Sequence, residues 1–73
     1  MNLPAQKRII RIKTVCSYTS LSRSYIYLLT KQQKFPKPIS LVPGGTSVAW
    51  VEQEVIAWVE QRIAERDGGA SNE

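Results

Sequence analysis

Two proline-containing stretches, KFPKP at residues 34–38 and VPGG at residues 42–45, interrupt the middle of this 73-residue chain. A residue before proline is disfavoured in the helical region, so Phe35 and Pro36 are expected to end any helix that reaches them. The glycines after Pro43 readily take positive φ, which favours a tight turn. β-Prone segments stand on both sides of that turn, at residues 39–42 and 47–50. The sequence therefore predicts a helix followed by a β-hairpin.

A helix is expected immediately before the first proline stretch. Ser22 is a good N-cap, because its hydroxyl can accept the free amide of residue 24 or 25. Leu21, just before the cap, can pack against Ile26 as a hydrophobic staple. Ile26 and Leu29 share one face of the helix, and Tyr25 is expected to join them through Leu29. The remaining surface is left to Arg23, Ser24, Tyr27, Leu28 and Lys31.

A longer helix is predicted from residue 51 to about residue 66. Its apolar residues repeat at alternating spacings of three and four, which places them in one stripe. The stripe consists of Val51, Val55, Trp58, Val59 and Ile63. Acidic residues in the first turn and arginines near the end suit the helix dipole. Asp67, Gly68 and Gly69 are expected to stop this helix.

The N-terminal part adds two short elements. RIIRIK suits a short β-branched strand beside the core, and KTVCSYT suits a brief helix. The predicted fold is α+β, in the order strand, helix, helix, strand, strand, helix. We expect a flexible arm at residues 1–7, one domain at residues 8–66 and a disordered tail at residues 67–73. A domain of this size buries only about 60% of its unfolded surface, so its core is small.

Cys16, Trp50 and Trp58 are expected in that core. A single cysteine cannot form an intramolecular disulfide, and each indole needs only an acceptor for its N–H group. The longest apolar run is far shorter than the roughly 20 residues that span a bilayer, and no signal-peptide core is present. These features are typical of a cytoplasmic protein that does not enter a membrane.

Charge is strongly segregated along the chain. Every acidic residue lies at or after Glu52, so residues 1–51 carry eight positive charges and no negative one. From residue 52 onward, six acids and two arginines give a net charge of minus four. A basic surface attracts polyanions, and nucleic acid is the most common polyanion inside cells. The alternative is that the basic residues only keep a small protein soluble.

The composition argues against catalysis. The chain contains no histidine, which removes the usual general base at neutral pH and the most common metal ligand. One cysteine and six scattered acids provide too few ligands for a tetrahedral zinc site. Gly44 and Gly45 belong to no phosphate-binding motif. We therefore expect no enzyme, no metal and no cofactor.

Two short helices followed by a hairpin indicate a helix-turn-helix with a wing. In that motif the second helix lies in the major groove of DNA, and its N-terminal residues reach base edges. Arg23 can bind guanine or phosphate, and Ser22 and Ser24 can donate to phosphate. The other candidates on and after this helix are Tyr27, Lys31, Lys34 and Lys37. For Arg23 alone, an ordinary solvated helix residue is an equally good interpretation.

The hairpin is a candidate wing beside the neighbouring minor groove. Gly45, Thr46 and Ser47 can offer backbone amides and hydroxyls to phosphates. The alternative is an ordinary two-stranded turn, because the tip of the hairpin carries no positive charge.

Two stretches, LSRSYIYLLTKQQKFPKPISL and SVAWVEQEVIAWVEQR, together resemble the AlpA family of small prophage regulators. This family is related to phage excisionases and shares a winged-helix DNA-binding domain with MerR-type regulators. The resemblance implies a MerR/excisionase-like winged helix-turn-helix that binds double-stranded DNA at an attachment site or promoter. It also implies action as a recombination directionality factor beside an integrase.

The resemblance places Ser22, Arg23, Ser24 and Tyr27 in the recognition helix of the family. The family commonly has glycine at the positions of Ser20 and Gln33, which implies a left-handed or adjusted backbone there. It commonly has arginine at the positions of Leu28 and Thr46. Leu28, if exposed, is expected to contact a thymine methyl group or a neighbouring protomer.

A second hypothesis makes the chain a protein-interaction accessory, such as an anti-repressor or an integrase-binding protein, with little DNA binding of its own. It rests on Leu28, which lies on a helix that should face solvent, and on the acidic final helix. An excisionase can combine both activities by binding several DNA sites cooperatively as neighbouring protomers.

Overall fold

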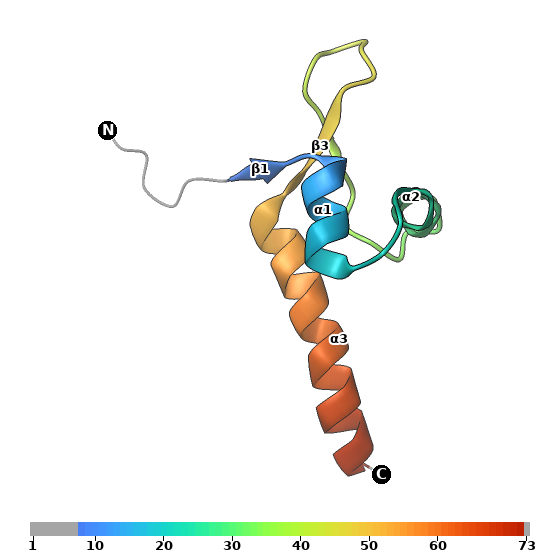
Figure 1. The fold of residues 1–73 in the computed structure, drawn as a ribbon, viewed down its shortest axis with the longest axis vertical. Coiled ribbons are helices and arrows are strands. Elements are labelled where there is room, and N and C mark those ends of the chain that lie inside the picture. Colours follow the sequence, from blue (N-terminus) through green and yellow to red (C-terminus); the bar gives the residue numbers. More distant parts are fainter. Residues whose placement is uncertain (1–7, 73) are drawn as a thin grey trace, which may run out of the picture.

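The computed structural model describes residues 8–72, so the arm predicted at residues 1–7 lies outside the described residues. Short strands and helices follow one another along this part of the chain, as Figure 1 shows. The elements are β1 (Ile9–Ile10), α1 (Ile12–Thr19), α2 (Arg23–Lys31), β2 (Ile39–Ser40), β3 (Val48–Val51) and α3 (Glu52–Asn72). This order confirms the predicted α+β class and the predicted sequence of elements.

β3 is the central strand of a small antiparallel sheet with the order β1-β3-β2. On one side β3 pairs with β1, which places Ile10 opposite Trp50. On the other side it pairs with β2, which places Ile39 opposite Ala49 and confirms the hairpin. The Glu52 amide also donates to the Arg8 carbonyl at 2.7 Å, so the β1 pairing reaches the first residue of α3.

One small core forms where the helices meet β3. Its buried members are Ile10, Val15, Ile26, Phe35, Trp50 and Val55. Full burial of one large apolar side chain contributes about 1.5–3 kcal/mol. Every helix and the strands β1 and β3 supply such a residue, whereas both residues of β2 are exposed. Trp50 is fully buried, as predicted, while Cys16 and Trp58 are half-buried against the core.

A left-handed turn separates α1 from α2. Ser20 has a φ of 62°, and its amide donates to the Cys16 carbonyl at 2.7 Å, which closes the end of α1. The Thr19 hydroxyl accepts from the Leu21 amide at 3.2 Å and donates to the Val15 carbonyl at 3.0 Å. These bonds hold the turn in shape, and the left-handed backbone that the resemblance implied at Ser20 is confirmed.

α2 ends at Lys31, before the proline stretch that was expected to stop it. Gln33 has a φ of 62° and donates its amide to the Thr30 carbonyl at 3.0 Å, while the Lys34 amide reaches the Leu29 carbonyl at 2.8 Å. This pair of bonds is a Schellman motif, which satisfies the last carbonyls of a helix. The left-handed backbone implied at Gln33 is thus confirmed, and it directs Phe35 into the core.

β2 covers only the first half of the segment predicted at residues 39–42, because the chain turns early. The Leu41 amide donates to the Ser47 carbonyl at 2.9 Å, and the Gly45 amide donates to the Val42 carbonyl at 2.8 Å. Gly44 has a φ of 78°, as a turn glycine should. A Cβ atom on Gly45 would lie 3.3 Å from the Cβ atom of Val42, so glycine is also favoured there by space.

The prediction that Tyr25 joins the core face of α2 is wrong. Its side chain is 47% exposed, whereas Ile26 is fully buried and Leu29 is half-buried. Successive residues of an α-helix are turned by about 100°, because a turn takes about 3.6 residues. Tyr25 therefore lies beside the stripe centred on Ile26 rather than within it.

The prediction that α3 stops at residues 67–69 is also wrong, because the helix continues to Asn72. Glycine within a helix costs only about 1 kcal/mol relative to alanine, and no proline follows to break the helix. The predicted apolar stripe is buried only in its first half: Val55 is fully buried, while Ile63 is 47% exposed. Figure 1 shows why, since α3 extends past α1 and α2 and its last turns have no neighbouring element.

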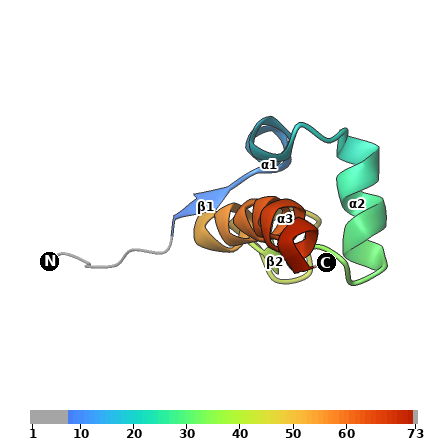
Figure 2. The same cartoon turned by 90° about the horizontal axis from the view of Figure 1, so that it is seen from below.

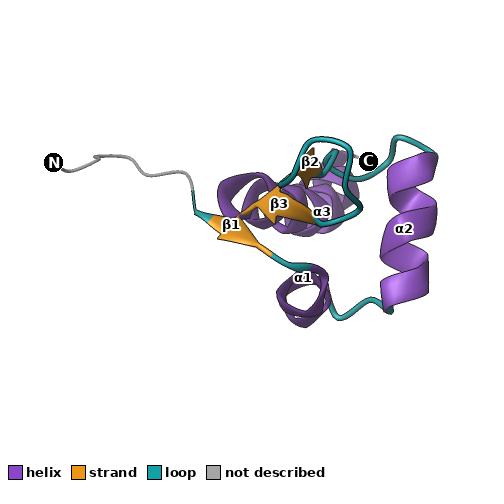
Figure 3. Cartoon of the chain, turned by 90° about the horizontal axis from the view of Figure 1, so that it is seen from above, coloured by secondary structure: helices purple, strands orange, loops and turns teal. Residues whose placement is uncertain are grey.

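α2 lies at one side of the molecule. In Figures 2 and 3, it runs across the direction of α3, and β1 lies on the opposite side. The hairpin loop and the end of α3 project from opposite ends of the molecule in Figure 1. One face of α2 therefore meets the core and the other is open to solvent.

Candidate nucleic-acid interface

Ser22 defines the start of α2. Its backbone is extended, and its Oγ accepts the Tyr25 amide at 3.1 Å, which confirms the predicted N-cap. The first turn of α2 contains no acidic residue. The partial positive charge at this end of the helix is therefore not offset by a carboxylate of its own first turn, and it favours an anion.

The face of α2 that points away from Ile26 carries most of the predicted site. Ser24, Leu28 and Lys31 lie on it by helical geometry, and all three are exposed. Tyr27 lies at its edge, 43% exposed, with its ring centroid 6.0 Å from that of Trp50. This ring contact ties Tyr27 to the core and limits the positions that its side chain can take.

Leu28 is 44% exposed near the middle of this open face. A leucine in that position adds nothing to the core of the protein itself. Tyr25, one turn earlier, is exposed as well, so the two form an apolar strip among polar and basic side chains. Leu28 is therefore exposed, which the sequence left open. Its contact with a thymine methyl group or a neighbouring protomer stays a prediction.

The predicted cations lie along α2 and along the segment after it, residues 32–38, which we call the connector. Arg23, Lys31, Lys34 and Lys37 are all exposed. Within residues 8–72, none of them forms an ion pair with a carboxylate. The ion pairs in this part of the chain belong instead to Arg8, Arg62 and Arg66. The positive charge of α2 and the connector is thus available to an external anion.

The wing residues are less favourable than predicted. Gly45 and Thr46 are exposed and Ser47 is half-buried. The Gly45 amide is occupied by the Val42 carbonyl, at 2.8 Å, so it is not free for a phosphate. The exposed side chains nearest to the turn include Leu41 and Val42, which are apolar. A contact between this loop and DNA stays a prediction, and it depends on Thr46 and Ser47 more than on Gly45.

The groups that hold the connector could not be identified from the sequence. The Trp50 indole Nε1 donates to the Pro36 carbonyl at 3.0 Å, and the Trp58 indole Nε1 donates to the Lys34 carbonyl at 2.9 Å. Phe35, between these carbonyls, is 6% exposed and meets the Trp58 ring edge-on at 4.9 Å. The sequence signalled only that each indole needs an acceptor, which does not identify the acceptor.

Glu52, the first acid of the chain, is engaged away from α2. Its carboxylate accepts the Tyr18 hydroxyl at 2.6 Å and lies 3.8 Å from the Arg8 guanidinium. The hydrogen bond to Glu52 raises the pKa of the Tyr18 hydroxyl above its usual value, because it stabilises the protonated form. Desolvation and the charge of Glu52 act in the same direction, while Arg8 opposes them. This cluster joins the residue before β1 to α1 and α3 and leaves the cations of α2 unpaired.

A shallow pocket of about 310 Å³ lies beside the end of α2, lined by Thr30, Gln33, Phe35 and Lys37. No group of three or more histidine, cysteine, aspartate or glutamate side chains in the described part of the chain is placed to hold a metal ion. Between residues 8 and 72 there is no helix with the length and apolar character needed to cross a membrane.

The two linked helices, the three-stranded sheet and the hairpin define a small winged helix-turn-helix domain. A model of the family described as "Prophage CP4-57 regulatory protein (AlpA)" matches residues 8–63. An uncharacterized protein, ORF88, of Enterobacteria phage P4 is 45% identical over 71 residues, which cover 94% of this chain and 78% of that protein. No solved structure matched the chain. The chain therefore belongs to the AlpA family of prophage regulatory proteins.

Proposed function

We propose that this protein is a sequence-specific DNA-binding regulator of a prophage or genomic island, acting in the cytoplasm of the bacterial host. α2 enters the major groove, as the second helix of a helix-turn-helix does. The observation that carries the proposal is the charge of α2 and the connector, where four exposed cations have no acidic partner among residues 8–72. A polyanion is the partner that this charge favours most.

Each residue of the proposed interface has a role that follows from its place on α2. Arg23, in the first turn, reaches a guanine edge or a phosphate, and Ser24 donates to phosphate. Ser22 keeps its capping bond and brings the helix start close to the backbone of the DNA. Lys31, at the end of α2, and Lys34 and Lys37, in the connector, contact phosphates further along the groove.

Binding of labelled duplexes measured by fluorescence anisotropy tests the proposal. Duplexes from the attachment site and the promoter of the element are compared with a random duplex over a range of salt concentrations. Each phosphate that the protein neutralises contributes about 0.9 to the logarithmic salt slope. Equal binding of all duplexes at every salt concentration would contradict sequence-specific recognition.

Arg23→Ala is expected to weaken cognate binding by about 1–3 kcal/mol and to relax the base preference at one position, if Arg23 reads a base. An equal loss on all duplexes would assign Arg23 to phosphate instead. Arg66→Ala is the matched control, because it removes the same charge from α3, where Arg66 pairs with Asp67 at 2.7 Å. The control is expected to bind DNA nearly as the unchanged protein does.

Leu28 is proposed to contact the methyl group of a thymine, because it is apolar and near the middle of the face that enters the groove. Deoxyuridine lacks that methyl group, and its removal from an apolar contact corresponds to about 0.8 kcal/mol, or about fourfold in affinity. At one position of the site, replacement of thymine by uracil is expected to weaken DNA binding by the unchanged protein. The same replacement should leave DNA binding by Leu28→Ala unaffected. If no position in the site shows this pattern, the contact does not exist.

The role in recombination is a finer proposal. A recombination directionality factor binds beside the integrase and promotes excision, in some cases through cooperative binding of several protomers. An excision reaction with purified integrase and attachment sites tests it directly. Excision that proceeds equally with and without the protein would leave transcriptional control as its role.

A protein-interaction accessory is the second candidate, favoured by the exposed apolar pair Tyr25 and Leu28. In that case α2 meets the integrase or another protomer rather than DNA. A pull-down with integrase in the presence of nuclease separates the two hypotheses. Capture that survives nuclease and is abolished in Leu28→Ala would favour the accessory role.

A further inference from the structure

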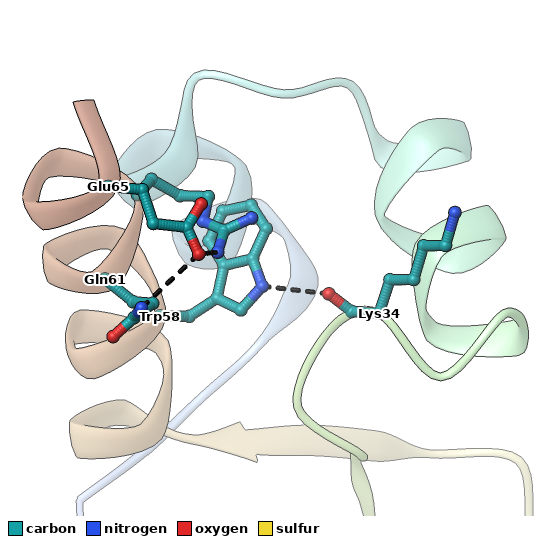
Figure 4. A network of polar contacts seen from close by, with 5 residues as sticks. Lys34, Trp58, Gln61 and Glu65 are labelled. Carbon is teal, nitrogen blue, oxygen red and sulfur yellow. Dashed lines mark hydrogen bonds and ion pairs between the residues drawn. The ribbon is translucent and has the colours of Figure 1, made fainter. Parts of the chain in front are cut away.

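The connector is held by its backbone from two directions. Trp50, in β3, donates to the Pro36 carbonyl, and Trp58, in α3, donates to the Lys34 carbonyl. These carbonyls belong to the residues before and after Phe35, which is itself only 6% exposed. Figure 4 shows the Trp58 indole directed at the Lys34 carbonyl, while the Lys34 side chain extends away from the indole.

Lys34 links the last turn of α2 to α3 through its own peptide groups. Its amide donates to the Leu29 carbonyl of α2 at 2.8 Å, and its carbonyl accepts the Trp58 indole of α3 at 2.9 Å. Two consecutive hydrogen bonds thus run from α2 to α3 through one residue. Because the Schellman motif fixes the end of α2 to the connector, any freedom of the connector is passed on to the helix.

The Trp58 indole is itself held in place. The Phe35 ring meets it edge-on at 4.9 Å, and the Arg62 guanidinium lies over its ring, 5.3 Å from the centroid. Arg62 forms an ion pair with Glu65. The Glu65 carboxylate also accepts a hydrogen bond from Gln61 Nε2 at 3.3 Å. An aromatic ring with a cation over its face and a second ring against it has few alternative orientations.

We propose that Trp58 is a positioning residue for DNA recognition, acting through its indole N–H on Lys34 and thereby on α2. The proposal rests on the proposed function of α2 as the DNA-reading helix. Base readout needs a fixed helix geometry, whereas attraction between lysines and phosphates tolerates a looser one. The loss of the N–H group should therefore reduce the preference for cognate DNA more than it reduces general DNA binding.

Trp58→Phe removes the donor and keeps an aromatic ring. Replacement of Trp58 by 3-benzothienylalanine is the sharper variant, because it preserves the shape of the indole and replaces only the N–H group by sulfur. Both variants are expected to lose about two- to tenfold in affinity for the cognate duplex, the equivalent of one hydrogen bond. Affinity for a random duplex is expected to stay unchanged.

Val59→Ala is the matched control, because Val59 is half-buried on the same helix and has no donor for the connector. It lowers stability by loss of packing and should leave the ratio of cognate to random affinity unchanged. All proteins are compared below their melting temperatures, with the fold checked by circular dichroism. An equal loss of this ratio in Val59→Ala, or none in the benzothienyl variant, would overturn the proposal.

Amide hydrogen exchange provides a measurement that needs no DNA. In the Trp58 variants the amides of Gln33 and Lys34 should exchange about two- to tenfold faster, while those in the α1–β1 region keep their rates. Unchanged exchange at the Lys34 amide would refute the proposed role of Trp58 even if DNA binding changed. If the unchanged protein shows no preference for cognate DNA, the proposed function fails, and the exchange result alone decides whether Trp58 holds α2.

Discussion

Replacement of Ser22 by alanine removes the side-chain oxygen that accepts the Tyr25 amide at 3.1 Å. A serine-to-alanine change at an N-cap costs about 0.5–2 kcal/mol, with about 1 kcal/mol as a typical value. In a domain of this size, a loss of 1 kcal/mol lowers the Tm by about 4–8 °C. Thermal denaturation followed by circular dichroism is therefore expected to show a clear downward shift for Ser22→Ala.

Ser22→Asp separates this structural role from DNA binding. Aspartate can accept the same amide, and it adds a negative charge to a helix whose first turn contains no acid. Such a charge stabilises a helix by about 0.3–1 kcal/mol, so the Tm should stay the same or rise. The same charge would lie where α2 is proposed to approach phosphates. Cognate affinity should therefore fall, and the logarithmic salt slope should decrease by about 0.9 for each phosphate that the variant no longer neutralises.

Ser22→Ala is thus expected to lower the Tm. Ser22→Asp is expected to keep or raise the Tm and to lower the affinity for cognate DNA. Ser17→Asp is a suitable control for DNA affinity, because Ser17 is exposed on α1 and the change adds the same charge away from the start of any helix. Its Tm should fall slightly, because Ser17 lies in the last turn of α1, where a negative charge opposes the helix dipole. An unchanged Tm for Ser22→Ala would show that the cap contributes no stability. Unchanged DNA affinity for Ser22→Asp at low salt would show that the first turn of α2 is not close to phosphate.

Three further predictions concern the backbone and one titrating pair. Ser20→Gly and Gln33→Gly should each raise the free energy of unfolding in urea by about 0.5–1 kcal/mol, because both residues have a φ of 62°, which glycine adopts more easily. A loss of stability in both would contradict this account. Gly44→Ala should lower the same free energy by more than about 1 kcal/mol, since alanine is strained at a φ of 78°. Glu52→Gln should lower the pKa of Tyr18, measured by ultraviolet titration, because the hydrogen bond from Tyr18 to Glu52 is the main cause of its elevation. A pKa that is raised in the folded state means that this stabilisation is complete below about pH 10, the unfolded value, and is lost as the pH rises through the folded pKa. Stability should therefore fall at high pH in the unchanged protein and fall less in Glu52→Gln.

Much of the fold could be predicted from the sequence because its signals act over a few residues. The Ser22 cap depends on an oxygen three residues before an amide, and the turn at Gly44 depends on one backbone angle. The order of helices and strands followed from such signals. The concentration of positive charge before Glu52 likewise required no structure.

The predictions that were wrong, and the features that the sequence left undecided, depend on neighbours that are distant in the chain. Tyr25 and Ile63 have the spacing of core residues, but each is 47% exposed, and α3 continues past the glycines expected to end it. The exposure of Leu28 follows from the side of α2 that meets the core. The partnership of Glu52 with Tyr18, rather than with a lysine near α2, could not be inferred from spacing either.

The sequence by itself determined the elements, their order and the sign of the charge that they carry. Only the tertiary structure decided which strand pairs with β1, which carbonyls accept the two indoles and which cations remain unpaired. The physical reason is range. Caps, turns and helical periods are set by interactions within one or two turns of chain, whereas a bond such as that from Trp58 to Lys34 joins residues 24 apart. Its acceptor is fixed only when α2, the connector and α3 have packed together.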